Sequence, residues 1–215
     1  MIYVEPQPEP DDFDAEVRRP GRAALEELVE QPDSHELGAT YRITDLRYGD
    51  LPPLWRRCLP QLATAYQRIC AYSCHYVEPT TGWGSVDHYV PKSLQPRLAY
   101  EWSNYRFACG RMNARKGSAT DVLDPFEVED GWFQIDLVRF QLHPAPGLPP
   151  ELIARIERTI EQLRLNGDAL RQTREDVCRD FWEGRISLPF LQRRYPLVAH
   201  ELRRQGCLRP PWRVS

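Results

Sequence analysis

The sequence predicts an α+β fold in which a small unit of two strands and one helix lies between helical segments at both ends of the chain. Residues 70–117 combine strand and helix signals with a high density of polar and reactive side chains. The flanking residues repeat apolar side chains at helical spacing, interrupted by proline and glycine. We therefore expect an acidic, mostly helical extension over residues 1–57, a core with its lead-in helix over 58–120, and a strand with a mainly helical scaffold over 121–215.

Composition places the chain among globular proteins. Its 215 residues, 41% hydrophobic and 27% charged, are enough to bury a sizeable core. No run of about 18 apolar residues predicts a transmembrane helix, and the first residues lack the basic flank and apolar stretch of a secretion signal. Six unevenly clustered cysteines favour a reducing compartment over a disulfide framework. We expect a cytoplasmic protein without a membrane partner.

The net charge of −3 conceals a polarised distribution. Residues 1–36 hold eleven acidic and three basic side chains, whereas residues 87–117 hold six basic and two acidic ones, and residues 185–215 seven basic and one acidic. Basic stretches attract the phosphate backbone of nucleic acid. DNA is therefore the expected partner of the central and C-terminal stretches.

Helical segments are expected on both sides of the core. Asp11 or Asp12 can cap a short helix that Pro20-Gly21 ends, and Ala23 to Val29 should form another. The other expected elements are a short strand over 40–46, a helix over 54–69 with a potential kink at Pro60, a strand over 132–142, and helices over 150–165, 168–184 and 187–206, the last interrupted at Pro196.

The core pattern reads as strand, turn, strand and short helix. Asp87 and His88 follow a glycine-rich turn and precede Pro91, which indicates a strand or its exit loop. Residues 100–107 alternate aromatic and polar side chains, as expected for a second strand or a tight turn leading into one. A helical pattern begins at Cys109 and closes with a glycine C-cap at position 117.

This core contains the groups that phosphodiester hydrolysis requires, namely a base, a metal site and cations. The imidazole of His88, with an ordinary pKa of about 6.5, can accept a proton from water near neutral pH. Asp87 and Asn113 offer hard oxygen ligands for Mg²⁺ or Mn²⁺. The candidates for contacts with a nucleic-acid backbone are Lys92, Arg111, Arg115 and Lys116.

Three short motifs in this core resemble the HNH endonuclease family in its histidine, asparagine, asparagine form. They are Val86-Asp87-His88-Tyr89-Val90-Pro91-Lys92-Ser93, Trp102-Ser103-Asn104 and Asn113-Ala114-Arg115-Lys116. Asn104 lies sixteen positions after His88, and Asn113 lies nine positions after Asn104. The resemblance covers about the middle quarter of the chain.

The resemblance implies a ββα-metal fold and a role for each matching residue. His88 is expected to be the general base, and Asp87 and Asn113 the ligands of a single catalytic metal. Asn104 is expected to brace the loop that holds the base. Each residue also has a structural alternative: an isolated strand histidine is usually structural, an asparagine can cap a turn, and cations at a helix end can be solvated. Trp102 and Tyr105 are expected in the core.

The chain departs from many relatives at the structural zinc site. Those relatives carry two C-x-x-C pairs, whereas here three residues separate Cys70 from Cys74, and Cys109 is followed by Met112. A thioether is a poor zinc ligand beside thiolates. Either His75 completes a distorted zinc site, or zinc is lost and the sulfur side chains pack as an apolar plug. The ligand count favours loss.

The sequence thus predicts a metal-dependent DNA endonuclease of low sequence specificity, because no recognition helix for base readout is evident. The segments 102–105 and 112–117 also resemble the nuclease subunits of Septu-type or retron-linked anti-phage systems. That resemblance implies bacterial antiviral defence with an ATPase partner. The alternatives are a non-catalytic interaction subunit that keeps the ββα fold and an RNA-cleaving toxin of the same fold.

Overall fold

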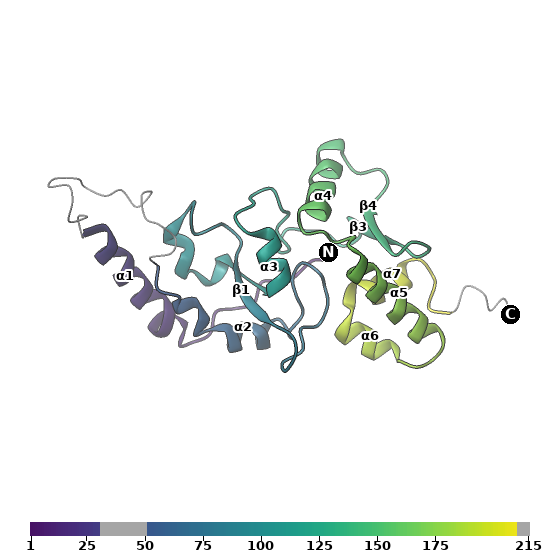
Figure 1. The fold of residues 1–215 in the computed structure, drawn as a ribbon, viewed down its shortest axis with the longest axis horizontal. Helices are drawn as coiled ribbons and strands as arrows, with labels where there is room; N and C mark the ends of the chain where they lie inside the picture. Colours follow the sequence, from purple (N-terminus) through teal and green to yellow (C-terminus); the bar gives the residue numbers. More distant parts are fainter. Residues whose placement is uncertain (31–50, 210–215) are drawn as a thin grey trace. The chain divides into compact units, whose positions relative to one another are not determined.

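The computed structural model describes residues 1–30 and 51–209, so the strand expected over 40–46 lies outside the described residues. The chain divides into two compact units. The first unit comprises Pro6–Arg68 and Gly82–Thr120, and the second comprises Met1–Glu5, Ile69–Thr81 and Asp121–Ser215. Both units combine helices with a two-stranded sheet, which confirms the α+β class (Figure 1). Pro6–Arg68, which contains most of the predicted N-terminal extension, falls in the same unit as Gly82–Thr120.

The first unit is organised around an antiparallel pair of strands, β1 (Gly84–His88) and β2 (Tyr105–Cys109). In their register Asp87 lies opposite Arg106, and His88 lies opposite Tyr105. Helix α3 (Gly110–Lys116) follows β2 directly and packs on β1 (Figure 1). The predicted order of strand, strand and helix is confirmed, and Gly117 ends the helix with a positive φ of 52°.

Residues 100–107 adopt the second of the two predicted forms, a tight turn that leads into a strand. Two 3₁₀ turns, η5 (Pro96–Tyr100) and η6 (Trp102–Asn104), occupy the start of the alternating segment, and β2 begins at Tyr105. Aromatic side chains at the start of this segment are buried by contacts outside the sheet. The indole N–H of Trp102, for example, donates to the carbonyl of Gln7 at 2.8 Å. Trp102 and Tyr105 are buried, as predicted.

The N-terminal helix continues through Pro20-Gly21, so the predicted end at this pair is wrong. A π-helical turn, η1 (Asp14–Arg18), runs directly into α1 (Arg19–Glu30). Pro20 closely follows the π-helical turn, where the regular i→i−4 bonding is already interrupted, so the helix accommodates a residue without an N–H. Gly21 lies against the ring of Tyr100, and a Cβ there would stand 2.2 Å from a ring carbon. The glycine therefore permits close packing within the first unit.

The helix expected over 54–69 is divided in two. A 3₁₀ turn, η4 (Leu54–Arg56), precedes α2 (Leu59–Ala65), and Pro60 lies in the first turn of α2. Proline is favoured at that position because its missing N–H would have no partner in the helix. The division places Trp55 on a separate turn that packs against β1.

The second unit pairs a hairpin with four helices. The strand expected over 132–142 folds into β3 (Phe133–Asp136) and β4 (Gln141–Pro144), because the Asp136 carboxylate accepts the amides of Val138 and Arg139 and closes a turn. The helices are α4 (Pro150–Gln162), α5 (Asp168–Trp182), α6 (Leu188–Arg194) and α7 (Pro196–Arg204), and they confirm the predicted helical C-terminal third. Within residues 1–30 and 51–209, no helix combines the length and apolar character needed to cross a bilayer.

Candidate functional site

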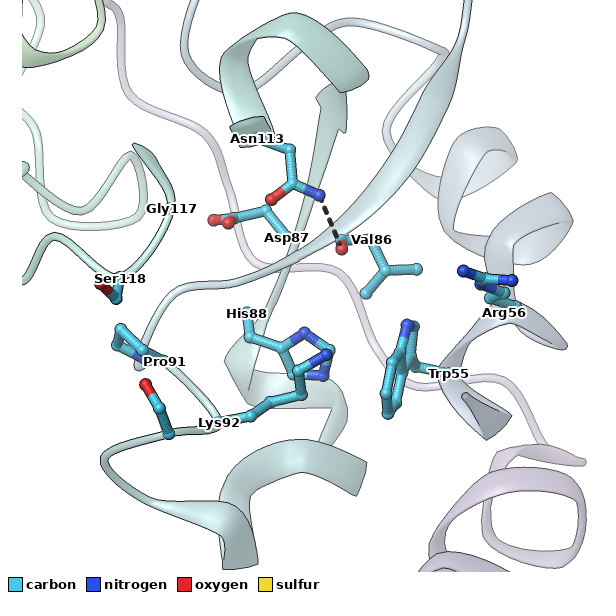
Figure 2. A pocket seen from close by; sticks show the side chains of 11 residues that line it. Trp55, Arg56, Val86, Asp87, His88, Pro91, Lys92, Asn113, Gly117 and Ser118 are labelled. Carbon is cyan, nitrogen blue, oxygen red and sulfur yellow. Dashed lines mark hydrogen bonds between the residues drawn. The ribbon is translucent and has the colours of Figure 1, made fainter. Parts of the chain in front are cut away.

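A pocket of about 580 Å³ opens on the first unit, beside the last residues of β1. It is lined by Trp55, Arg56, Val86, Asp87, His88, Pro91, Lys92, Ser93, Asn113, Gly117 and Ser118. Figure 2 shows these side chains converging from β1, α3, η4 and the loop after β1. Four of the predicted site residues, Asp87, His88, Lys92 and Asn113, therefore share one pocket.

His88 is held in one tautomer by a main-chain carbonyl. The residue is 7% exposed, and its Nε2 lies 2.9 Å from the carbonyl oxygen of Ala99. A carbonyl can only accept, so we assign the ring proton to Nε2 and leave Nδ1 as the basic nitrogen. The Tyr105 hydroxyl donates to the same oxygen at 2.7 Å, and the rings of Trp55 and Tyr105 meet the imidazole edge-on. The ring is thus fixed in orientation as well as in protonation state.

The surroundings of His88 keep its ring neutral. Burial lowers the pKa of His88 to about 3, and the nearby Lys92 and Lys116 ammonium groups act in the same direction. The hydrogen bond to Ala99 opposes them. An imidazole that is neutral at pH 7 can accept a proton from water. An anionic ligand in the pocket would favour the imidazolium and raise this pKa toward the range useful for a base.

Lys116 is buried against β1, which contradicts its predicted contact with nucleic acid. Its side chain is fully enclosed, and Nζ lies 3.2 Å from Asp87 Oδ1 and 2.8 Å from the His88 carbonyl oxygen. Position 116 is three residues after Asn113, so both side chains lie on the face of α3 that meets β1. The three-residue spacing between Asn113 and Lys116 was the sequence feature that could have predicted the burial of Lys116. Lys116 instead holds the strand residues of the pocket in place.

The carboxamide of Asn113 is oriented by two acceptors on β1. Its Nδ2 donates to Ser85 Oγ at 3.1 Å and to the Val86 carbonyl at 3.2 Å. Ser85 Oγ itself donates to the Ala108 carbonyl at 2.9 Å, so it accepts from Asn113. The Asn113 oxygen is consequently turned toward the carboxylate of Asp87 (Figure 2). One carboxylate and one amide oxygen suit a divalent cation that keeps several waters.

Asn104 lies beneath the loop that follows β1. Its Oδ1 accepts the Val90 amide at 2.8 Å, and its Nδ2 donates to the carbonyls of Val90 and Leu98 at 3.0 and 3.1 Å. The residue is 5% exposed and does not line the pocket. These three bonds join the loop after His88 to the segment before Ala99, which matches the bracing role that the resemblance implies for Asn104.

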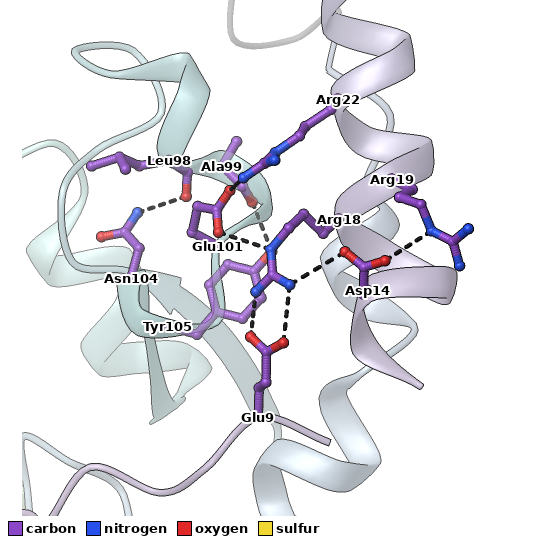
Figure 3. Close-up of polar contacts among 10 residues, drawn as sticks. All are labelled: Glu9, Asp14, Arg18, Arg19, Arg22, Leu98, Ala99, Glu101, Asn104 and Tyr105. Atoms are coloured by element: carbon purple, nitrogen blue, oxygen red, sulfur yellow. Dashed lines mark hydrogen bonds and ion pairs between the residues drawn. The ribbon is translucent and has the colours of Figure 1, made fainter. Parts of the chain in front are cut away.

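An ion-pair cluster at the N-terminal helix supports the same segment (Figure 3). Arg18 donates to both carboxylate oxygens of Glu9 and, through Nε, to Glu101 at 3.0 Å. Arg22 reaches the other oxygen of Glu101 at 2.7 Å. Glu101 stands two residues after Ala99, so this cluster ties α1 to the turn that carries the His88 acceptor. One feature of the sequence pointed to this cluster, because Glu101 is an acidic residue within a basic stretch.

Cations surround the mouth of the pocket. The Lys92 ammonium lies 3.7 Å from the centroid of the Trp55 ring, and burial, followed by the charge of Arg56, lowers its pKa to about 8. Arg56 is exposed and lines the pocket, although sequence reasoning did not select it. Arg111 is exposed and Arg115 half-buried on α3, and neither lines the pocket. The pocket therefore presents positive charge to an incoming anion.

The predicted zinc ligands fall in different units. Cys70 and Cys74 are buried in the second unit, and Cys109 is half-buried in the first. Burial raises the pKa of Cys74, which favours the thiol over the thiolate that zinc binds. In the part of the chain that the structure describes, no three His, Cys, Asp or Glu side chains form a metal-binding group. The fate of zinc in this chain stays a prediction.

The pocket unites a neutral imidazole with a fixed tautomer, two converging oxygens and flanking cations. These are the parts that water activation and charge stabilisation at a phosphoryl group require. No family model matches the chain, and no curated protein matches it.

Proposed function

We propose that the first unit is an HNH-type endonuclease that hydrolyses phosphodiester bonds in DNA with low sequence specificity. The observation that carries the proposal is the tautomer of His88, whose Nε2 is bound to Ala99 while Nδ1 is left basic. The same pocket contains Asp87 and Asn113 as oxygen ligands. The bond to Ala99 would also satisfy a structural histidine, but here it leaves Nδ1 basic in a pocket that contains two candidate oxygen ligands, as a general base requires.

Each polar side chain of the pocket has a defined task in this proposal. His88 accepts the proton of the attacking water at Nδ1, and its bond to Ala99 becomes stronger as the ring gains charge. Asp87 and Asn113 would hold Mg²⁺ or Mn²⁺, which when bound supplies Lewis-acid stabilisation of the phosphoryl and leaving oxygens. Lys92 and Arg56 attract and position the phosphate backbone.

Cleavage of supercoiled plasmid DNA in Mg²⁺ tests the role of His88. We expect His88→Ala to lower the cleavage rate by about 10²- to 10⁴-fold, the usual contribution of a general base. His143→Ala is the matched control, because His143 is an exposed imidazole on β4 of the second unit and should leave the rate unchanged. Undiminished cleavage by folded His88→Ala protein would contradict the mechanism and favour a non-catalytic interaction subunit.

The ligand role of Asn113 is tested by metal titration. Asn113→Ala removes the amide oxygen, so we expect at least about a 10-fold higher Mn²⁺ concentration for half-maximal activity. Asn113→Asp retains an oxygen ligand and should keep metal binding. Direct Mn²⁺ binding, followed by electron paramagnetic resonance, gives the same ranking without turnover. Equal Mn²⁺ affinity of wild type and Asn113→Ala would remove Asn113 from the ligand set.

The proposed setting is bacterial anti-phage defence, with an ATPase as partner. It is supported by the resemblance of residues 102–105 and 112–117 to the nuclease subunits of such systems. Co-purification from the native host tests the partner, and absence of any ATPase from the complex would count against it. Parallel assays on DNA and RNA separate the DNA endonuclease from an RNA-cleaving toxin of the same fold.

A further inference from the structure

Trp83 is the most exposed large apolar residue among those described in the first unit. Its side chain is 76% exposed at the turn that precedes β1. The chain position is fixed, because the Gly110 amide donates to the Trp83 carbonyl at 2.7 Å. The indole also lies over Gly110, where a Cβ would stand 2.7 Å from two ring atoms. One part of the ring is therefore seated on a bare backbone while the rest faces solvent.

Trp83 directly precedes β1, the strand whose last residues line the pocket. Within β1, Ser85 contacts Asn113 and Asp87 contacts Lys116, so both side chains face α3. Trp83 rests on Gly110, the first residue of the same helix. The four residue steps from Trp83 to Asp87 cover about 13 Å at about 3.3 Å per residue. This is the length of about four stacked nucleotides at about 3.4 Å each.

The charge of this region favours an anionic partner over a basic or neutral one. Both acidic side chains of residues 87–117 are in ion pairs, Asp87 with Lys116 and Glu101 with Arg18. The other basic side chains of that segment are Lys92, Arg97, Arg106, Arg111 and Arg115. Arg111 is exposed and directly follows the residue on which the indole rests. An aromatic ring beside cations is the combination that binds single-stranded nucleic acid.

We infer that Trp83 is a stacking platform for an unpaired base of the nucleic-acid strand whose phosphate backbone enters the His88 pocket. The inference rests on the proposed function and narrows its substrate to strands with unpaired nucleotides. In a duplex each base is stacked between its neighbours, so its face is not accessible to a surface indole. Trp83 should distinguish unpaired from paired nucleotides but should not distinguish one base from another, because every base has a π-face.

Binding without cleavage tests the inference. Fluorescence anisotropy with labelled 12-nucleotide DNA, the equivalent RNA and a 12-base-pair DNA duplex is measured in EDTA, where hydrolysis is not required. We expect Trp83→Leu to weaken single-strand binding by about 5- to 100-fold, the range found for base–aromatic stacking. Trp83→Phe should keep most of the affinity, and the duplex should be affected far less. The DNA and RNA arms show which strand the platform accepts.

Two further variants control for general effects of the surface. Leu94→Ala removes another exposed apolar side chain of the first unit, 57% exposed, and should leave single-strand binding unchanged. Gly110→Ala adds a Cβ under the indole and should weaken binding by displacing the ring. Equal single-strand affinity of wild type and Trp83→Leu would overturn the subsite alone and leave the proposed function standing. No binding by wild type to any probe would overturn the subsite and the proposed function together.

Discussion

The two units bury carboxylates in contrasting ways. Glu201 of the second unit is fully buried and accepts from Nε and Nη2 of Arg204 at 2.7 and 2.8 Å, from the Ile135 amide at 2.8 Å and from Gln205 at 3.1 Å. These four donors match the roughly four acceptor sites of a carboxylate. Asp87 of the first unit is paired with Lys116 but also lines a pocket.

The contrast separates a carboxylate that completes a fold from one that can serve a ligand. The donors of Glu201 tie α7 to β3, because the Ile135 amide belongs to that strand. Arg174 has a similar structural task in the same unit, since its guanidinium donates to the carbonyls of Phe140 and Leu165. Burial and charge alone therefore do not indicate a functional site. Asp87 differs from these residues because it lines a pocket together with the carboxamide of Asn113.

The largest expected effect on stability is that of Lys116→Met. Removing the ammonium leaves Asp87 as a buried charge without its paired cation, which costs about 3–5 kcal/mol of unfolding free energy. Urea denaturation measures the loss, and Asp87→Leu in the same chain should recover much of it. Mg²⁺ should raise the melting temperature of Lys116→Met more than that of wild type, because it replaces the missing charge. A variant as stable as wild type would refute the importance of the pair.

Glu201→Leu should lower the free energy of unfolding less than Lys116→Met does, and it should leave cleavage by the folded protein unchanged. The Ile135 amide loses its acceptor, which costs about 1–3 kcal/mol, whereas Arg204 is 35% exposed and can turn to water. Because this carboxylate is structural, plasmid cleavage at a temperature where the variant is folded should match wild type. Reduced cleavage by folded protein would break the contrast between the two carboxylates.

The smallest expected effect is the pH dependence of stability that arises from each of two buried histidines. Burial lowers the pKa of His88 to about 3 and that of His75, in the second unit, to about 4. Each imidazole binds fewer protons in the folded state than in the unfolded state. The stability that depends on each histidine is therefore greatest above about pH 6.5, and it is lost as the pH falls toward the pKa of the folded state. Each histidine should cost about 1.4 kcal/mol of stability between pH 7.5 and 5.5.

Nuclear magnetic resonance titration of the two imidazoles sharpens this prediction. A non-hydrolysable phosphorothioate oligonucleotide should raise the pKa of His88, because it brings negative charge into the pocket, and leave that of His75 unchanged. Titration of ligand-free His88 near pH 6.5 would contradict its burial. Equal shifts at both histidines would show that the ligand does not act through the pocket.

The sequence was informative wherever a local pattern decided the structure. The strand at Asp87 and His88 and the helix end at Gly117 follow from turn and capping signals within a few residues. Lys116 was misread because its neighbour Arg115 makes the pair look like solvated helix-end charges, and only the packing of α3 on β1 reveals its burial. Trp55 and Arg18 were missed because they lie 29 and 66 residues before the start of β1, and no local signal connects them to the strand.

The acceptor that fixes the His88 tautomer has a consequence for mutagenesis. It is the main-chain oxygen of Ala99, a residue with 0% exposure, and every side-chain exchange leaves that oxygen in place. Saturation mutagenesis at position 99 would show only which side-chain sizes are tolerated. It would not test the hydrogen bond that the main-chain oxygen accepts from His88. Replacing the peptide link between Ala99 and Tyr100 by an ester, which accepts hydrogen bonds more weakly, would address that oxygen directly.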